Sequence, residues 1–330
     1  MIHKNKFYIK NLETIFFLGY EDFHEDFIKV NKSLKIKTII VSSKKKFKNN
    51  HKILFYKKSK FDNKFKKFVV DNCKKNRTLF ISFSARWIFK KKDINDLFHN
   101  DLINFHNSRL PADAGGGGFS WRIMRNDRIS NCLVHLIDEN IDTGPIIHQD
   151  TSVFPINCRI PIDFENYSKI KLIKFYKDLI TDLKKGNEFK LINQSKTNRS
   201  YYPRINTDIN GWINWDLNSN DLIYFINAFD DPYSGSSTYI NNKQKVRIKQ
   251  ACLHGGELPN HPFMSGIIYR KTKKWIVVAT SDKNSLIIEK VLDKRGKNII
   301  DELKIGDRFY TTPNKKFVSR SLRIKYVLKN

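Results

Sequence analysis

Cysteine is scarce in this chain and is never paired at short spacing. The 330 residues contain only Cys73, Cys132, Cys158 and Cys252, and no two of them form a C-x-x-C pattern. This scatter argues against a zinc ribbon and against a secreted domain held together by disulfides. It is typical of proteins in a reducing compartment, so we expect a cytoplasmic location.

Long apolar runs are also missing near the N-terminus. The apolar stretch Thr14–Tyr20 is too short for the core of a signal peptide or for a membrane span, and its composition is that of a buried strand. No Gly-x-Gly-x-x-Gly pattern follows this stretch, so dinucleotide binding has little support.

Acidic residues are few relative to basic ones. The sequence has 61 Lys and Arg against 33 Asp and Glu, a formal net charge of +28. The densest basic window, Lys44–Lys67, holds eleven Lys and a single acid, Asp62. Nucleic-acid binding, including a non-enzymatic RNA-binding protein, is one interpretation. We favour A/T-rich codon bias, because Lys, Asn, Ile and Phe are abundant together and the charge is spread along the chain. A basic surface would still attract anionic substrates.

The first half of the chain has the pattern of an α/β domain, and a length of 330 residues favours two domains in total. Short apolar runs alternate with amphipathic stretches, which predicts strands over 14–19, 37–42, 53–56 and 78–83 and helices over 22–32 and 63–72. This alternation is typical of a Rossmann-like domain with a mostly parallel sheet. Ligands of such sheets bind at the carboxyl ends of the strands.

The second half has the pattern of a small β-barrel. Residues 163–185 lack Pro and Gly and predict a long helix that ends at Gly186. After a turn-rich stretch over 193–211 come five strand-like runs, at 236–239, 245–250, 266–270, 275–279 and 285–291. We therefore expect a catalytic domain at 1–195, a linker at 196–210 and an OB-like C-terminal barrel domain at 211–330.

Residues 104–144 carry the pattern most specific to chemistry. Asn104 and His106 stand two apart on a segment predicted to be extended, so their side chains point the same way. A Ser-x-Leu-Pro turn follows, and a later Asp-x-x-x-Asp-Thr-Gly turn, which contains Asp142, can bring a carboxylate to the same place. An amide donor, an imidazole and a carboxylate are the groups that acyl transfer to an amine requires.

The segment resembles the folate-dependent formyltransferases, the family of methionyl-tRNA formyltransferase, which carry a formyl group from 10-formyltetrahydrofolate to an amine. The family pattern is Asn-Ile-His-Pro-Ser-Leu-Leu-Pro, then Asp-x-Gly-x-Asp-Thr-Gly. This chain departs from it at four positions, where Phe105, Asn107, Arg109 and Asn140 replace Ile, Pro, Leu and Gly. Asn140 is a mild change, since Asn accepts a left-handed backbone more readily than most residues.

The resemblance implies that Asn104, His106 and Asp142 are catalytic. Asn104 would stabilise the carbonyl oxygen as it gains negative charge. His106 would move the proton, because imidazole titrates near neutrality. Asp142 would orient His106 or accept the amine's proton through water, and the order of proton transfer stays open. This chemistry requires no metal, and we interpret His254 and His261 as residues of a turn-rich loop.

The resemblance also implies a place for the formyl donor, 10-formyltetrahydrofolate. Backbone groups after the fourth strand hold the pterin ring in the family, at positions that correspond to Arg86, Trp87 and Ile88. Asp138 and Asp142 would form the other wall. A plain strand-to-helix turn is the alternative for this segment. His135 lies inside an apolar strand and is interpreted as a packed core histidine.

The candidate acceptor-binding residues are Ser108, Arg109, Gly117, Phe119 and Trp121. Four consecutive glycines permit close approach of a compact acceptor, and no Lys-Ser/Thr follows them at P-loop spacing. Because two-domain family members with such a segment look most like nucleotide-sugar N-formyltransferases, we expect the amine of a nucleotide-linked amino sugar. Methionyl-tRNA is the alternative, on account of the basic charge and the barrel. A homodimer stays open, and we expect no membrane partner.

Overall fold

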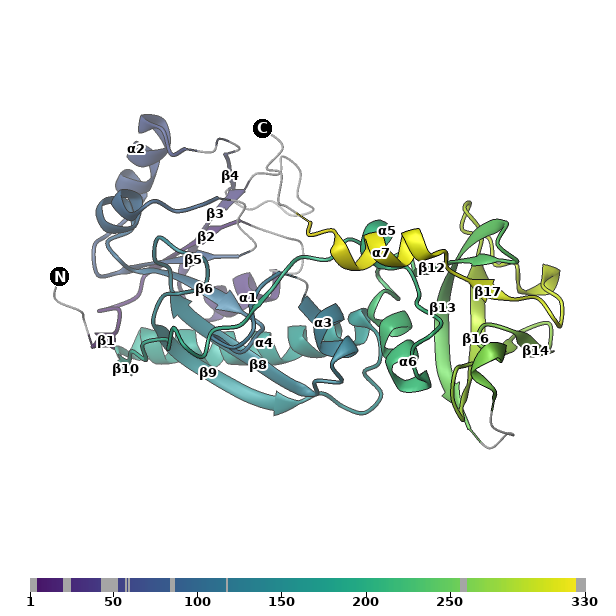
Figure 1. Cartoon of the computed structure of the whole chain (residues 1–330). Helices are drawn as coiled ribbons and strands as arrows, with labels where there is room; N and C mark the ends of the chain where they lie inside the picture. The colour runs from purple at the N-terminus through teal and green to yellow at the C-terminus, as the bar shows by residue number, and fades with distance from the viewer. Residues whose placement is uncertain are drawn as a thin grey trace. The chain divides into compact units, whose positions relative to one another are not determined.

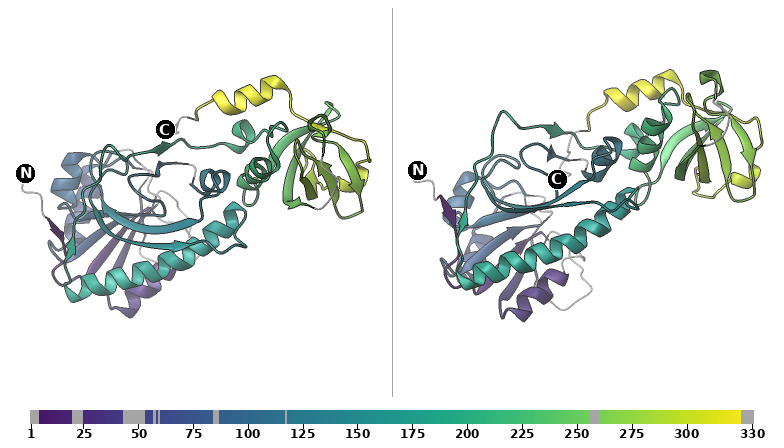
Figure 2. Two further views of the ribbon diagram at one scale, coloured as in Figure 1. Left: turned by 60° about the horizontal axis from the view of Figure 1, so that its bottom comes forward. Right: turned by 90° about the horizontal axis from the view of Figure 1, so that it is seen from below.

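The computed structural model describes residues 5–19, 25–42, 53–56, 58, 60–83, 87–116, 118–255 and 260–324. The chain forms two compact units that alternate along the sequence (Figures 1 and 2). The first comprises 1–115, 129–152 and 168–201, and the second 116–128, 153–167 and 202–330. Packing thus places residues 116–128 and 153–167 in the same unit as the C-terminal part. The division predicted from the sequence, with its linker at 196–210, kept them in the N-terminal domain. The domain division stays a prediction.

The first unit is built on a seven-stranded sheet in the order β4-β3-β2-β5-β6-β8-β9. The strands are β2 (Thr14–Leu18), β3 (Lys37–Ser42), β4 (Ile53–Phe55), β5 (Thr78–Ser82), β6 (Leu102–His106), β8 (Ile129–Leu136) and β9 (Ile146–Val153). The strands from β4 to β6 pair in parallel, and β8 pairs antiparallel with β6. The predicted Rossmann-like, mostly parallel sheet is therefore confirmed.

Helices cover both faces of this sheet: α1 (Glu25–Ser33), α2 (Asn63–Asn72) and α4 (Pro161–Lys185). Because side chains alternate along a strand, neighbouring residues of β2 enter different cores. Phe17 packs with Tyr176 of α4, whereas Phe16 packs with Phe80 in the core that includes α2. The predicted stop at Gly186 is confirmed by its left-handed backbone, with φ 82°.

The remaining described elements before residue 203 are short. They are β1 (Lys6–Phe7), β10 (Phe189–Lys190), the π-helix η2 (Asp93–Leu97), β7 (Ala114–Gly115), α3 (Gly118–Met124) and β11 (Tyr201–Tyr202). β1 pairs antiparallel with β10. No helix in the part of the chain that the structure describes is both long and apolar enough to cross a membrane.

A curled six-stranded antiparallel sheet dominates the second unit, in the order β14-β15-β16-β13-β12-β17 (Figure 1). Its strands are β12 (Ser236–Ile240), β13 (Gln244–His254), β14 (Ile268–Lys271), β15 (Ile276–Ala279), β16 (Ser285–Leu292) and β17 (Phe309–Tyr310). The two edges meet, since Ile267 bridges Arg308 and the amide of Ile268 donates to the carbonyl of Asp307 at 2.8 Å. The expected barrel is confirmed, with β17 as an additional strand.

The other elements of this unit are α5 (Thr207–Asn210), α6 (Ser219–Ala228), α7 (Pro313–Ser321) and the 3-10 turns η3 (Pro262–Met264) and η4 (Ile300–Glu302). Leu222 and Ile226 of α6 are fully buried and belong to the barrel core, together with Trp215. The segment predicted as a linker therefore contains α5, and α6 follows it as part of the core.

Candidate active site

The carboxyl end of β6 presents two polar side chains. Asn104 pairs with Ser82 across the parallel β5–β6 ladder, and β6 ends at His106. Asn104 and His106 are two residues apart on a strand, so they lie on the same face, while Phe105 between them is buried in the core. The expected strand geometry is therefore present at the edge of the sheet where α/β proteins bind their ligands.

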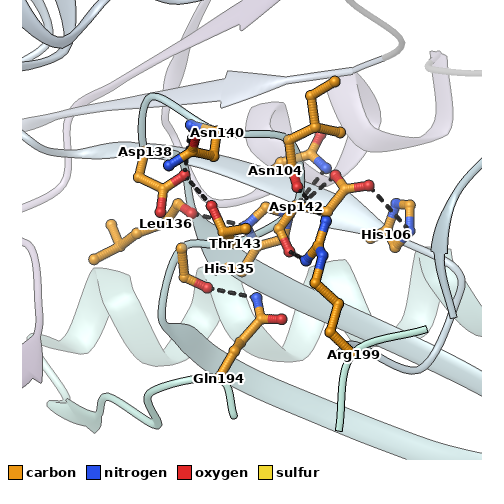
Figure 3. Close-up of polar contacts among 12 residues, drawn as sticks. Asn104, His106, His135, Leu136, Asp138, Asn140, Asp142, Thr143, Gln194 and Arg199 are labelled. Atoms are coloured by element: carbon orange, nitrogen blue, oxygen red, sulfur yellow. Dashed lines mark hydrogen bonds and ion pairs between the residues drawn. The ribbon is translucent and has the colours of Figure 1, made fainter. Parts of the chain in front are cut away.

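A second histidine lies beside Asn104 because of the register between β6 and β8. The two strands pair antiparallel, with Asn104 directly opposite His135. The Nδ2 atom of Asn104 lies 3.2 Å from Nε2 of His135, and Nδ1 of His135 lies 2.7 Å from the carbonyl oxygen of Leu136 (Figure 3). His135 is therefore hydrogen-bonded to a candidate catalytic residue, in addition to being buried in the core as expected.

The turn after β8 brings Asp142 to the same place. Its Oδ2 atom lies 3.9 Å from Nε2 of His106, and its Oδ1 atom lies 3.9 Å from Nε2 of His135 (Figure 3). The side chains of His106 and Asp142 keep 21% and 14% of their surface exposed, so a substrate can reach them. The structure thus brings together Asn104, His106 and Asp142.

The Asp-Thr-Gly turn is held by its own side chains and by close packing. Oδ1 of Asp138 accepts hydrogen bonds from the amide of Asn140 and from the hydroxyl of Thr143. A Cβ atom at Gly144 would lie 1.8 Å from the carbonyl oxygen of Leu136, so only glycine fits there. Asp142 itself has a left-handed backbone, with φ 55°.

Two residues that the sequence analysis did not single out fix this turn from outside. Arg199 donates to the carbonyl oxygens of Asp142 and Ile141, at 3.0 and 2.7 Å. Gln194 donates to the carbonyl oxygen of Gly144 at 2.7 Å. Both lie in the irregular segment between β10 and β11, where no periodic pattern indicates which backbone groups they reach.

Burial controls the charge of His135. Removal from water lowers its pKa from 6.5 to about 4, with a further lowering by the neighbouring His106 imidazole. The bond to Leu136 and the carboxylates of Asp142 and Asp138 oppose this shift but do not cancel it. His135 is therefore neutral near pH 7 and cannot act as the charged partner of Asp142.

Comparison with protein families bears on both parts of the chain. Residues 32–157 match the family model of formyl transferase, and residues 206–305 match that of the formyl transferase C-terminal domain. The chain belongs to the formyltransferase family. The resemblance inferred from residues 104–144 is confirmed, and the first match contains all of the candidate catalytic residues.

Individual relatives agree with this assignment. The methionyl-tRNA formyltransferase of Mycoplasma mycoides subsp. mycoides is 28% identical over 219 residues, which cover 63% of this chain and 67% of the relative. A sugar 3N-formyl transferase, solved in the presence of dTDP and 5-N-formyl-THF, has a TM-score of 0.60 at 19% identity and covers 85% of this chain and 98% of its own. The N-formyltransferase of Helicobacter canadensis, in complex with folinic acid and dTDP-3-aminofucose, has a TM-score of 0.59 at 18% identity, with coverages of 84% and 99%.

The donor-binding residues predicted for this formyltransferase lie in different surroundings. Arg86 lies outside the described residues. Trp87 packs against the rings of Tyr56 and Phe61, whereas Ile88 is 67% exposed. Asp138 is engaged in holding its turn. The folate-binding roles of these residues stay predictions.

The predicted acceptor-binding residues divide between the two units. Ser108 and Arg109 belong to the first, and Nε of Arg109 donates to Oδ2 of Asp113 at 3.1 Å. Gly117 lies outside the described residues. In the second unit, Phe119 packs edge-on against Phe154, and the indole of Trp121 donates to the carbonyl oxygen of Pro203 at 2.7 Å. Their roles in acceptor binding stay predictions.

Within the described residues, no group of three or more His, Cys, Asp or Glu side chains could hold a metal ion. Nδ1 of His261 accepts a hydrogen bond from the amide of Phe263 and so caps the turn η3. All four cysteines are free thiols.

Proposed function

We propose that this enzyme transfers a formyl group from 10-formyltetrahydrofolate to the amine of an amino sugar that is linked to a nucleotide. The convergence of Asn104, His106 and Asp142 at the carboxyl edge of the sheet carries the proposal. Formyl transfer needs a hydrogen-bond donor for the acyl oxygen and an acceptor for the amine's proton, and these three side chains offer both.

The groups have complementary tasks during transfer. The amine nitrogen bonds to the formyl carbon, the bond between that carbon and N10 of the folate breaks, and the proton lost by the amine goes to N10. The amide of Asn104 stabilises the negative oxygen by about 3–4 kcal/mol, as removals of oxyanion donors indicate. His106 relays the proton, and Asp142, at 3.9 Å, reaches His106 through a small rotation or one water and favours its charged form.

The folate donor is supported by the relatives of similar fold, whose structures hold 5-N-formyl-THF or folinic acid. The sugar acceptor is supported by the same two proteins, one a sugar 3N-formyl transferase and the other in complex with dTDP-3-aminofucose. Their similarity extends over at least 84% of this chain. Methionyl-tRNA is the second candidate acceptor, because the sequence relative at 28% identity is a methionyl-tRNA formyltransferase.

A donor and acceptor assay tests the proposal. The protein is incubated with 10-formyltetrahydrofolate and either a panel of nucleotide-linked amino sugars or methionyl-tRNA, and the release of tetrahydrofolate is followed. We expect release with at least one amino sugar and no comparable release with methionyl-tRNA. No release with any acceptor, from a folded protein that binds folate, would contradict formyl transfer to these substrates.

Salt dependence separates the two acceptors independently. Binding of tRNA neutralises several phosphates, so its affinity should fall by orders of magnitude between about 50 and 200 mM salt. A nucleotide-sugar offers only one pyrophosphate, so we expect a gentle dependence. Efficient formylation of methionyl-tRNA that collapses over this salt range would favour the tRNA acceptor and overturn the sugar proposal.

A further inference from the structure

His135 is a buried imidazole in contact with the catalytic edge, and the proposed chemistry does not use it. Its side chain is 3% exposed. One ring nitrogen faces the backbone of β8 and the other faces Asn104 of β6. These two contacts together determine where the ring proton lies.

The bond to Leu136 fixes the tautomer. A carbonyl oxygen can only accept, so the contact of 2.7 Å between Nδ1 and the oxygen of Leu136 requires the proton on Nδ1. A neutral ring carries one such proton, which leaves a lone pair on Nε2. That lone pair accepts a hydrogen from the Nδ2 group of Asn104 at 3.2 Å.

This contact determines the orientation of the Asn104 amide. The two ends of a carboxamide have nearly the same shape, but one donates and the other accepts. An acceptor at Nε2 favours the orientation in which NH2 faces His135, and the second hydrogen of that group then serves the acyl oxygen. In the flipped orientation Oδ1 of Asn104 would face the lone pair of His135 and also the negative charge that develops on the acyl oxygen. Both contacts would be repulsive.

A protonated ring would lose this function. With hydrogens on both nitrogens, His135 would repel the Nδ2 group of Asn104. The hydrogen on Nε2 would instead face Oδ1 of Asp142, which lies 3.9 Å from Nε2. The His106 ring, whose centroid lies 6.4 Å away, would also meet a second positive charge when it relays its proton. The neutral form is therefore the one that fits the site.

We propose that His135 is a positioning residue for formyl transfer, whose unprotonated Nε2 holds the Asn104 amide with its NH2 group toward the acyl oxygen. The inference rests on the proposed role of Asn104 as the donor to that oxygen. It assigns to a buried histidine an effect on turnover rather than on substrate binding.

Two substitutions of similar polarity separate positioning from packing. Gln at 135 can place an amide oxygen where Nε2 lies, so His135→Gln can still accept from Asn104. Asn at 135 reaches only the position of Nδ1, so His135→Asn can keep the bond to Leu136 but offers Asn104 no acceptor. We expect His135→Asn to lower kcat by roughly 10- to 100-fold with little change in the KM for the folate, by analogy with a lost oxyanion donor. His135→Gln should stay within about fivefold of the wild type, since the neutral hydrogen bond to Leu136 that it loses contributes about 1 kcal/mol.

A double variant tests whether the effect passes through Asn104. In an Asn104→Ala background, His135→Asn should cause no further loss of kcat. Losses that multiply, or equal kcat values for His135→Asn and His135→Gln, would overturn the positioning role. Near-normal turnover in Asn104→Ala alone would contradict the proposed role of Asn104 as donor to the acyl oxygen, and with it this inference. An impaired Asn104→Ala beside a normal His135→Asn would instead overturn only this inference.

A measurement on the unaltered enzyme covers the case in which the variants do not fold. With ¹⁵N-labelled histidine, the ring nitrogens of His135 should report a proton on Nδ1 and none on Nε2 at pH 7. A proton on Nε2 would leave Asn104 without an acceptor and would contradict the inference.

Discussion

The guanidinium of Arg199 donates two hydrogen bonds to the backbone around Asp142, one to the carbonyl oxygen of Asp142 itself and one to that of Ile141. Asp142 has a φ of 55°, a conformation that costs a non-glycine residue about 1–2 kcal/mol. Two charge-assisted hydrogen bonds offset a cost of this size. Arg199 therefore stabilises the conformation in which the Asp142 carboxylate faces His106.

We expect Arg199→Ala to lower kcat by about tenfold, because loss of one or two kcal/mol lets the turn adopt other conformations. Arg199→Lys should recover only part of this loss, since a single ammonium lacks the planar fork that reaches two carbonyls. Steady-state kinetics with saturating folate measure the effect, and Lys196→Ala, an exposed position in the same segment, is the control. Equal kcat values for Arg199→Ala and Lys196→Ala would contradict the role of Arg199.

The three candidate catalytic residues should each be needed for turnover. We expect Asn104→Ala, His106→Ala and Asp142→Ala to lower kcat by roughly 10²-fold or more while the protein stays folded, as losses of oxyanion donors and general bases do. Release of tetrahydrofolate measures turnover, and circular dichroism checks the fold. His254→Ala and His261→Ala, in the second unit, should be close to neutral. Near-normal turnover in Asp142→Ala would remove it from the mechanism.

The depressed pKa of His135 predicts a dependence of stability on pH. The folded-state pKa is about 4 and the ordinary value is 6.5, so between these limits the unfolded chain binds a proton that the folded one does not. The contribution of His135 to the free energy of unfolding is therefore constant above pH 6.5. It falls by up to about 1.4 kcal/mol per pH unit as the pH drops toward 4. Denaturant unfolding at several pH values measures this slope.

His135→Gln is the matched control for this slope, because glutamine does not titrate. The variant should lose less stability than the wild type between pH 6.5 and 4, and the difference isolates His135 from the other titrating groups. Identical slopes in the two proteins would mean that His135 is protonated in the folded state over this range.

The parts of the fold that depend on local patterns could be predicted from the sequence. β3 covers Lys37–Ser42 and α2 covers Asn63–Asn72, with the predicted bounds. Period 2 also placed Asn104 and His106 on one face of a strand, and the Asp-Thr-Gly turn gave Asp142 its place near them. These features depend on residues close together in the chain, where spacing determines geometry.

Features that depend on distant contacts could not be predicted in this way. His135 meets Asn104 only through the register of β6 and β8, and a shift of one residue would turn it to the opposite face. Arg199 reaches the backbone of Asp142 from 57 residues away, through carbonyl groups that every residue type carries. β17 has two residues, too few to show a period.

The second unit contains a buried ion pair that should contribute to stability. Asp230 is fully buried, its Oδ2 atom accepts the amide of Gln250 at 2.7 Å, and its Oδ1 atom accepts the amide of Asp231 and lies 3.6 Å from Nζ of Lys249. Lys249 is held in addition by the carbonyl oxygen of Tyr233 at 3.0 Å. The carboxylate therefore joins the turn after α6 to the middle of β13.

We expect Asp230→Ala to lower the free energy of unfolding by about 3 kcal/mol or more, because it leaves two backbone amides and the buried ammonium of Lys249 with fewer partners. Asp230→Asn should cost less, since one oxygen remains to accept. The control is Asp216→Ala, which removes an ion pair with Lys316. The side chain of Asp216 is 74% exposed. Such surface pairs contribute at most about 1 kcal/mol. Calorimetry or guanidinium unfolding measures the free energy of unfolding of each variant. An equal, small loss for Asp230→Ala and Asp216→Ala would show that solvent or neighbouring groups can replace the carboxylate of Asp230.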